Sequence, residues 1–217
     1  MPHYKAVCFD FDYTLGDCTG SILASFRYAL PEMGFPVPDE DTLRGTIGYV
    51  LEDAYTMLTG DADPGRRAQF RPLYSSVATR NQVEDALLFP GAEALIRGLN
   101  AAGIATAIVS SRRAATTRAM MERFGLSDLF PIILGNTDVE KPKPDPQGLL
   151  IAMERLGLGP RDVLFCGDTV LDAGAARSAG CDFAAVLNGT TKADAFASFS
   201  PVHVAPDLSD LARWLDL

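Results

Sequence analysis

Near its beginning the chain reads Tyr4-Lys5-Ala6-Val7-Cys8-Phe9-Asp10-Phe11-Asp12-Tyr13-Thr14-Leu15, a short apolar run that leads directly into two carboxylates. The apolar residues 7–9 are typical of a parallel strand that is covered on both faces. In open α/β sheets, ligands bind at the carboxyl ends of the strands. We therefore expect the chain to open with a central strand whose carboxyl end carries a site.

The spacing of Asp10 and Asp12 has a physical consequence. If the strand continued through both residues, its period of two would place the carboxylates on one side, where each would raise the pKa of the other unless a cation lay between them. Such a pair is stable if a metal ion or a lysine offsets the charge, or if one acid is ionised and the other is protonated. The spacing alone also fits two solvated acids in a turn, because Asp is a common turn residue.

The composition limits the class of protein. The chain has 217 residues, of which 47% are hydrophobic, enough for one core domain with a smaller inserted domain but not for two full α/β domains. The formal net charge of −9 argues against a nucleic-acid-binding protein, which would show a basic face. A small anionic substrate is still allowed, because a local positive site can lie within a negative surface.

Four cysteines are spread along the chain without CxxC spacing, and two of them lie in strand-like apolar runs. We expect these cysteines to be reduced, and we expect no zinc site. No apolar run reaches the roughly 18 residues of a membrane span, and the first apolar run is too short for a secretory signal. These features predict a cytoplasmic protein that does not enter a membrane.

The hydrophobic pattern changes twice along the chain. Residues 21–30, 39–58 and 66–83 have helical spacing, with a weak point at Gly48, and no convincing strand is visible between Leu15 and Phe89. From Pro90 onward, helices alternate with strands. The expected helices are 91–102, 114–124, one within 144–157, and 172–179, and the expected strands are 104–109, 132–134, 163–166, 183–187 and an edge strand at 202–204. This order predicts a doubly wound parallel α/β sheet, formed by residues 1–15 and 88–217, with an all-helical insertion at residues 16–87.

Polar side chains follow three of the expected strands directly. Asp10 and Asp12 follow the first strand, Ser110 follows the strand at 104–109, and Asp168 follows the strand at 163–166. If these strands are neighbours, the side chains meet at one edge of the sheet. The stretch Glu140-Lys141-Pro142-Lys143-Pro144-Asp145-Pro146 adds positive charge on a segment that its prolines keep extended.

In this arrangement the chain resembles a haloacid dehalogenase (HAD) superfamily hydrolase with an α-helical cap, similar to the phosphoglycolate phosphatase and β-phosphoglucomutase branch. The resemblance spans the whole chain, and its specificity lies in four motifs that occur in order. They are Asp10-Phe11-Asp12-Tyr13-Thr14-Leu15, Val109-Ser110-Ser111, Lys141-Pro142-Lys143-Pro144-Asp145 and Gly167-Asp168-Thr169-Val170-Leu171-Asp172.

The resemblance implies a Mg²⁺-dependent phosphatase that hydrolyses a phosphate monoester through an aspartyl-phosphate. It implies that Asp10 is the nucleophile and that Asp12 is the general acid and base. Ser110, assisted by the backbone N–H of Ser111 at the start of a helix, would bind the phosphoryl oxygens, and Lys141 would neutralise the nucleophile and the phosphate. Mg²⁺ would be held by Asp10, Asp168 and the backbone carbonyl of Asp12, with Asp172 in a supporting position or bound through a water.

The residue chemistry agrees with these roles. A carboxylate does not approach a phosphate dianion unless the shared charge is offset, and a metal ion and a lysine would offset it. Hard oxygen ligands without a His or Cys cluster favour Mg²⁺ over zinc. One departure is Tyr13, which stands where the family often has Gly, and we expect it to affect cap closure and substrate choice but not the catalytic set.

Each residue also has an ordinary structural interpretation. Ser110 fits a helix N-cap, Lys141 fits a solvated surface charge, and Asp168 and Asp172 fit a turn acid and a helix-start acid. In the insertion, Arg44 near Gly48 is a candidate contact for the non-phosphate part of the substrate, and a surface arginine beside a helix break explains it equally well. The combination at successive strand ends is what favours the active-site interpretation.

Other functions remain as alternatives. A sugar phosphomutase of the β-phosphoglucomutase type would return the phosphoryl group to a second hydroxyl instead of water. A pyrophosphatase is a weaker alternative. A C–Cl dehalogenase would not need Asp12 or the metal, and a receiver-like phospho-switch would not carry a helical insertion of this length.

The expected partner is a small phosphorylated metabolite, with no nucleic acid and no membrane, and the expected state is a monomer or weak homodimer.

Overall fold

The computed structural model describes residues 4–217, without the side chains of residues 79–81, and the chain divides into two compact units. The first unit runs to Asp17 and resumes over Leu88–Leu217, and the second is the intervening segment Cys18–Leu87. One unit is therefore inserted into the other between Asp17 and Leu88.

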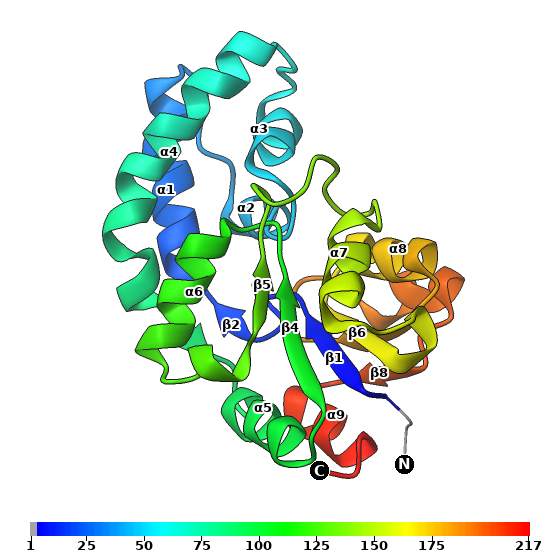
Figure 1. Cartoon of the computed structure of the whole chain (residues 1–217). Helices are drawn as coiled ribbons and strands as arrows, with labels where there is room; N and C mark the ends of the chain where they lie inside the picture. The colour runs from blue at the N-terminus through cyan, green and yellow to red at the C-terminus, as the bar shows by residue number, and fades with distance from the viewer. Residues whose placement is uncertain (1–3) are drawn as a thin grey trace. The chain divides into compact units, whose positions relative to one another are not determined.

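The first unit is built on a parallel sheet, which has six strands in the described part of the chain (Figure 1). The first strand lies inside the sheet, between two strands that are distant in sequence. The spatial order is β5 (Ile132–Leu134), β4 (Ala105–Val109), β1 (Ala6–Phe9), β6 (Val163–Gly167), β7 (Asp182–Val186) and β8 (His203–Ala205). This confirms the expected doubly wound parallel sheet.

Helices cover the sheet in two groups. One group contains α7 (Gln147–Leu156) and α8 (Val170–Ala179), which pack against each other and against strands of the sheet. The other contains α5 (Ala92–Ala101) and α9 (Leu208–Trp214), which also contact each other. The remaining elements are α6 (Ala114–Arg123) and the short 3₁₀ helices η1 (Ser127–Leu129), η2 (Pro160–Asp162) and η3 (Ala193–Phe199).

The composition of β1 explains its central position. All four residues, Ala6–Phe9, have no exposed surface, as the continuous apolar run predicts for a strand covered on both faces. Ala6 and Cys8 belong to a core cluster with Leu149 and Met153 of α7. The apolar run therefore fixes the carboxyl end of β1, with Asp10, deep within the unit.

The second unit is all-helical apart from its last residue. Its helices are α1 (Thr19–Glu32), α2 (Glu40–Arg44), α3 (Leu51–Thr59) and α4 (Pro64–Asp85), and α1 packs along α4 (Figure 1). Aromatic rings form its interior: Tyr55 and Phe70 have ring centroids 4.9 Å apart, and Phe26 packs edge-on against Tyr74 at 5.0 Å. The Asp39 and Asp63 side chains accept hydrogen bonds from backbone N–H groups at the starts of α2 and α4, which fixes these starts.

The sequence-based helix in 39–58 is interrupted around Gly48, as expected, and becomes α2 and α3. The expectation of no strand between Leu15 and Phe89 was wrong, because Gly16–Asp17 (β2) and Leu87–Leu88 (β3) pair as a two-stranded sheet. Two residues are too few to produce a periodic signal. The pattern also missed η3 and α9, which are short.

No helix in residues 4–217 combines the length and the apolar character that a membrane crossing requires.

Candidate active site

The strand order brings the predicted site residues to one edge of the sheet. In the registers of β1 with its neighbours, Phe9 lies opposite Ile108 of β4 and Cys166 of β6. Since β4 ends at Val109 and β6 at Gly167, Asp10, Ser110 and Asp168 are the first residues after the ends of three adjacent parallel strands. The Asp10 backbone N–H donates to the Cys166 carbonyl at 2.9 Å, which extends the ladder by one residue.

Three carboxylates form a buried cluster at this edge. Oxygen atoms of Asp10, Asp168 and Asp172 lie within 4.8 Å of one another, and no side chain of the three is more than 2% exposed. Burial, together with the neighbouring Asp172 and Asp12 and despite the opposing effect of Lys143, raises the pKa of Asp10 to about 6. Burial and the charges of Asp172 and Asp10 likewise raise the pKa of Asp168 well above its ordinary value. The cluster therefore carries more negative charge than its surroundings offset.

The lysine at this cluster is Lys143, and the expectation that Lys141 would lie there was wrong. The Lys143 ammonium is 3.0 Å from Asp10 Oδ1 and 2.6 Å from Asp172 Oδ1. Burial alone would lower the pKa of Lys143, but the Asp10 and Asp172 carboxylates outweigh it and raise the pKa above its ordinary value. Lys143 is therefore the cation that neutralises the predicted nucleophile.

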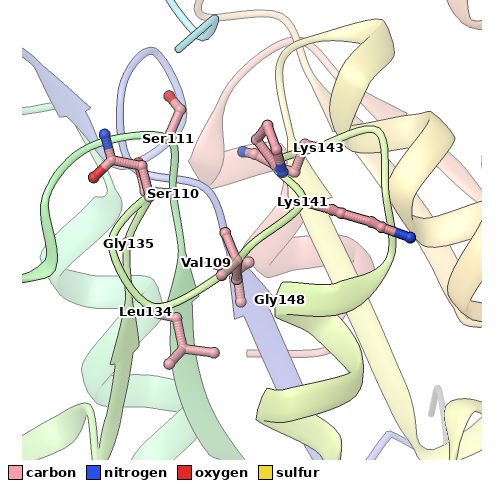
Figure 2. A pocket seen from close by; sticks show the side chains of 11 residues that line it. Val109, Ser110, Ser111, Leu134, Gly135, Lys141, Lys143 and Gly148 are labelled. Atoms are coloured by element: carbon pink, nitrogen blue, oxygen red, sulfur yellow. The ribbon is translucent and has the colours of Figure 1, made fainter. Parts of the chain in front are cut away.

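Lys141 is exposed instead, for a local reason. Its backbone N–H donates to the Gln147 side chain at the start of α7, at 2.7 Å, which holds the segment so that the Lys141 side chain extends away from the serines (Figure 2). The spacing Lys-Pro-x-Pro occurs twice in this stretch, starting at Lys141 and again at Lys143. This repeat was the feature of the sequence that could have indicated Lys143 as well as Lys141 as the lysine of the site.

Asp172 occupies a supporting position. Its Oδ1 faces Lys143, and its Oδ2 accepts hydrogen bonds from the Thr169 backbone N–H at 3.0 Å and the Thr169 hydroxyl at 2.6 Å. Thr169 caps the start of α8 in a capping box with Asp172. Both oxygens of Asp172 thus have protein partners, which agrees with the supporting role that the resemblance implies.

Two glycines make room for these acids. A Cβ added to Gly167 would lie 2.5 Å from the Asp172 side chain, and one added to Gly189 would lie 2.1 Å from Asp168 Oδ2. Neither distance is possible for a real Cβ, so each glycine permits a close approach that a side chain would block. Asn188 donates to the Thr14 carbonyl at 3.1 Å, and the Thr14 hydroxyl lies 3.3 Å from Asp168 Oδ1.

Tyr13 has a left-handed backbone conformation, with φ of 58°. This is the conformation that glycine adopts without strain and that a bulky residue adopts at a cost of about 1–2 kcal/mol. The Tyr13 side chain is buried, and its backbone N–H donates to the Gly16 carbonyl at 2.9 Å in the tight turn that follows Asp12. The geometry explains why glycine suits this position and shows that tyrosine keeps the same turn.

Asp12 lies outside the acid cluster. Its two carboxylate oxygens accept hydrogen bonds from Arg112, Oδ1 from Nη2 at 2.7 Å and Oδ2 from Nε at 3.0 Å. Sequence reasoning did not find Arg112. The only signal was its place two residues after Ser110, in the run Ser110-Ser111-Arg112-Arg113 at the end of a strand.

Ser110 and Ser111 line a small pocket with Lys143 (Figure 2). The Ser110 side chain is 6% exposed, and its oxygen accepts a hydrogen bond from the Arg112 backbone N–H at 3.3 Å. The hydroxyl proton of Ser110 is not used in that bond and can be donated to a ligand. Ser111 does not lie at the start of a helix as expected, because α6 begins three residues later, at Ala114.

Arg44 lies on α2 in the other unit. Its Nε is 3.2 Å from a carboxylate oxygen of Glu40, one helical turn earlier, and its side chain is 38% exposed. The exposed side chain fits the ordinary interpretation, a surface arginine beside a helix break. The role of Arg44 in substrate binding stays a prediction.

The site fits a divalent cation by the chemistry of its donors. Neither carboxylate oxygen of Asp10 accepts a hydrogen bond from the described residues, although both are buried and Oδ1 faces Lys143 as an ion pair. Buried acceptors without donors are costly unless a cation or a ligand satisfies them. Oxygen donors from Asp10 and Asp168, without sulfur or imidazole in the cluster, are of the kind that Mg²⁺ prefers.

Comparison with known proteins agrees with this geometry. Residues 7–186 match the family model described as haloacid dehalogenase-like hydrolase. A solved structure from Bacteroides fragilis, described as a haloacid dehalogenase-like hydrolase, is 35% identical, with a TM-score of 0.93 over 96% of this chain and 99% of that one.

Curated relatives include a phosphoglycolate phosphatase from Nitrosospira multiformis, 34% identical over 81% of this chain and 80% of its own length. Another phosphoglycolate phosphatase, from Yersinia pestis, is 28% identical over 95% of this chain and 91% of its own length. The chain therefore belongs to the haloacid dehalogenase-like hydrolase family and is a hydrolase of the phosphatase type.

Proposed function

We propose that the protein hydrolyses a small-molecule phosphate monoester in two steps, through an aspartyl-phosphate on Asp10. The observation that carries this proposal is the Asp10 carboxylate itself. It is buried, accepts no hydrogen bond from the described residues, and faces the Lys143 ammonium at 3.0 Å. A carboxylate held in this way, with its charge partly offset, suits a nucleophile better than a structural acid.

In the first step, an Asp10 oxygen forms a bond to phosphorus as the bond from phosphorus to the substrate oxygen breaks. Asp12 gives a proton to the leaving alcohol, and Ser110 donates a hydrogen bond to a phosphoryl oxygen. In the second step, Asp12 takes a proton from a water that attacks phosphorus, and phosphate leaves with Asp10 restored. Lys143 offsets the shared negative charge of Asp10 and the phosphoryl group throughout.

Mg²⁺, held by Asp10, Asp168 and the Asp12 backbone carbonyl, would supply further charge neutralisation when bound. Asp172 supports this set by orienting Lys143, which lies 2.6 Å from its Oδ1. The same acids would disfavour a phosphate dianion if no cation were present, so we expect activity to depend on the metal.

The substrate is proposed from the relatives. Two of them are named phosphoglycolate phosphatase, so a phosphate monoester of a small organic acid is the first compound to test. The residues described at the sheet edge recognise a phosphoryl group, and we propose that the inserted unit selects the rest of the molecule, with Arg44 as a candidate contact. We also propose that the protein works in the cytoplasm as a monomer or weak homodimer; its four cysteines are free thiols.

Phosphate release from 4-nitrophenyl phosphate and from phosphoglycolate tests the proposal. We expect turnover with Mg²⁺, little after chelation with EDTA, and a loss of several orders of magnitude in Asp10→Asn. Turnover by Asp10→Asn at a rate close to that of the wild type would show that Asp10 is not the nucleophile. Full activity in EDTA would contradict the metal requirement.

A further inference from the structure

A buried ion pair joins Asp12 to Arg112, which has no role in the mechanism above. The two side chains are 8% and 7% exposed, and both oxygens of the carboxylate are engaged by the guanidinium, at 2.7 Å and 3.0 Å. Two parallel contacts of this kind fix the position of a carboxylate and also the plane in which it lies.

The backbone of Arg112 is itself anchored. Its carbonyl accepts a hydrogen bond from the Asn136 backbone N–H at 3.0 Å, and its N–H donates to the Ser110 hydroxyl at 3.3 Å. Asn136 follows β5 and Ser110 follows β4, so two neighbouring strand ends hold this residue. Arg112 is thus placed by the sheet, and it can in turn place Asp12.

Asp12 needs such a support because the other charged groups of the site do not hold its side chain. The Lys143 ammonium lies near Asp10 and Asp172, and the buried acid cluster consists of Asp10, Asp168 and Asp172. Tyr13 then turns the chain away in a left-handed conformation. A residue that transfers protons in both half-reactions must keep its carboxylate within hydrogen-bond reach of the reacting oxygen.

We propose that Arg112 is the positioning residue of Asp12, which it holds in the orientation required for proton transfer. This inference rests on the proposed function and adds a residue to it. Arg112 acts through Asp12 and does not itself contact the phosphoryl group. Its loss therefore slows those steps that need a proton from Asp12 and spares those that do not.

Two substrates separate these steps. 4-Nitrophenyl phosphate has a leaving group that departs without protonation, whereas glycerol 2-phosphate loses an alkoxide that needs a proton. The ratio kcat/KM reports on the steps up to cleavage of the substrate. Arg112→Met should lower kcat/KM about tenfold or more for glycerol 2-phosphate and leave it within about twofold for the aryl phosphate, since positioned proton transfer contributes roughly 10²–10⁴-fold.

Arg113 provides the matched control, because it is the neighbouring arginine and its side chain is exposed. Arg113→Met should change neither value. Arg112→Lys keeps a positive charge but cannot make both contacts, so it should show the same selective loss to a smaller degree, and it provides the test if methionine prevents folding. In an Asp12→Asn background, Arg112→Met should have no further effect, because a residue that acts through Asp12 has nothing left to position.

Equal losses on both substrates, an additive loss in the Asp12→Asn background, or no loss at all would each overturn the assignment of Arg112. These results are distinct from failure of the proposed function, which would appear as absence of phosphate release by the wild type.

Discussion

Two lysines stand two residues apart on the proline-rich segment, and one of them contacts the acids. Lys143 is 8% exposed and pairs with Asp10 and Asp172, whereas Lys141 is exposed and its backbone is tied to Gln147. A buried charge that two carboxylates hold has a fixed position, and a solvated charge does not. The chemistry that depends on a lysine should therefore depend on Lys143.

Matched substitutions of the two lysines test this assignment. Lys143→Met should lower kcat with phosphate monoesters by about 10²-fold or more, the usual effect of removing a positioned electrostatic contact. Lys141→Met should change kcat by less than about twofold. Steady-state kinetics in Mg²⁺, with circular dichroism to verify folding, give the comparison; a larger loss in Lys141→Met would restore the sequence-based assignment.

The residues at the strand ends could be predicted because each follows an apolar run directly. To predict that Asp10, Ser110 and Asp168 share one edge, it was enough to recognise the strands and to apply the rule that parallel strands place their carboxyl ends at one edge. Lys143 could not be separated from Lys141, because both begin a Lys-Pro-x-Pro stretch. Arg112 could not be assigned to Asp12, because a contact between residues 100 positions apart depends on side-chain direction, which spacing does not encode.

At the scale of elements, the start of α8 connects stability with the acid cluster. Thr169 caps the helix, and its hydroxyl and N–H both donate to Asp172, which in turn holds Lys143. The same side chain therefore begins the helix and orients an acid of the site.

Thr169→Val should affect both properties. We expect a loss of about 1 kcal/mol in the free energy of unfolding, as for other N-caps, and a weaker apparent affinity for Mg²⁺. Urea unfolding and a Mg²⁺ titration of activity measure the two effects.

Asp207→Ala is the control, since Asp207 caps α9 through the Asp210 N–H and is not among the residues at the acid cluster. It should lower stability by a similar amount and leave the Mg²⁺ titration unchanged. Thr169→Ser should keep both properties near those of the wild type. An unchanged Mg²⁺ titration in Thr169→Val would show that the Thr169 side chain does not affect metal binding at the site.

The elements that the sequence predicted well have either a continuous apolar run or a helical pattern that ends at a glycine. Strands such as Ile132–Leu134 and helices such as Ala114–Arg123 agree within one residue with the expected 132–134 and 114–124. The strands β2 and β3 were missed because two residues form no recognisable pattern, and α9 was missed because seven residues make only about two helical turns. The spatial order of the strands was not predicted, since the pattern gives only their order along the chain.

At the scale of the whole molecule, the acid cluster is a source of instability. Asp10 is buried with a pKa of about 6, and burial also raises the pKa of Asp168. As the pH rises from about 4 to about 6, the unfolded chain releases the proton of Asp10 before the folded chain does. The free energy of unfolding of the metal-free protein should therefore fall across this window, by roughly 3 kcal/mol for Asp10 at about 1.36 kcal/mol per pKa unit.

Unfolding measurements in EDTA at pH values between 4 and 7 test the direction in which the free energy of unfolding changes. The wild type should lose stability relative to Asp10→Asn as the pH rises, and at pH 7 the substituted protein should be the more stable of the two. Added Mg²⁺ should raise the midpoint of the wild type more than that of Asp10→Asn. A wild type that gains stability relative to Asp10→Asn over this range would contradict the burial argument.

In the proposed mechanism, Asp10 becomes phosphorylated during turnover. Rapid acid quenching during turnover of a phosphate monoester, followed by peptide mass spectrometry, tests it most directly. We expect the added mass of one phosphoryl group on the peptide that contains Asp10. It should be absent in Asp10→Asn and increased in Asp12→Asn with an aryl phosphate, because hydrolysis of the intermediate is then slowed. Turnover without any phosphorylated Asp10 peptide, or with the phosphoryl group on another residue, would show that Asp10 is not the nucleophile.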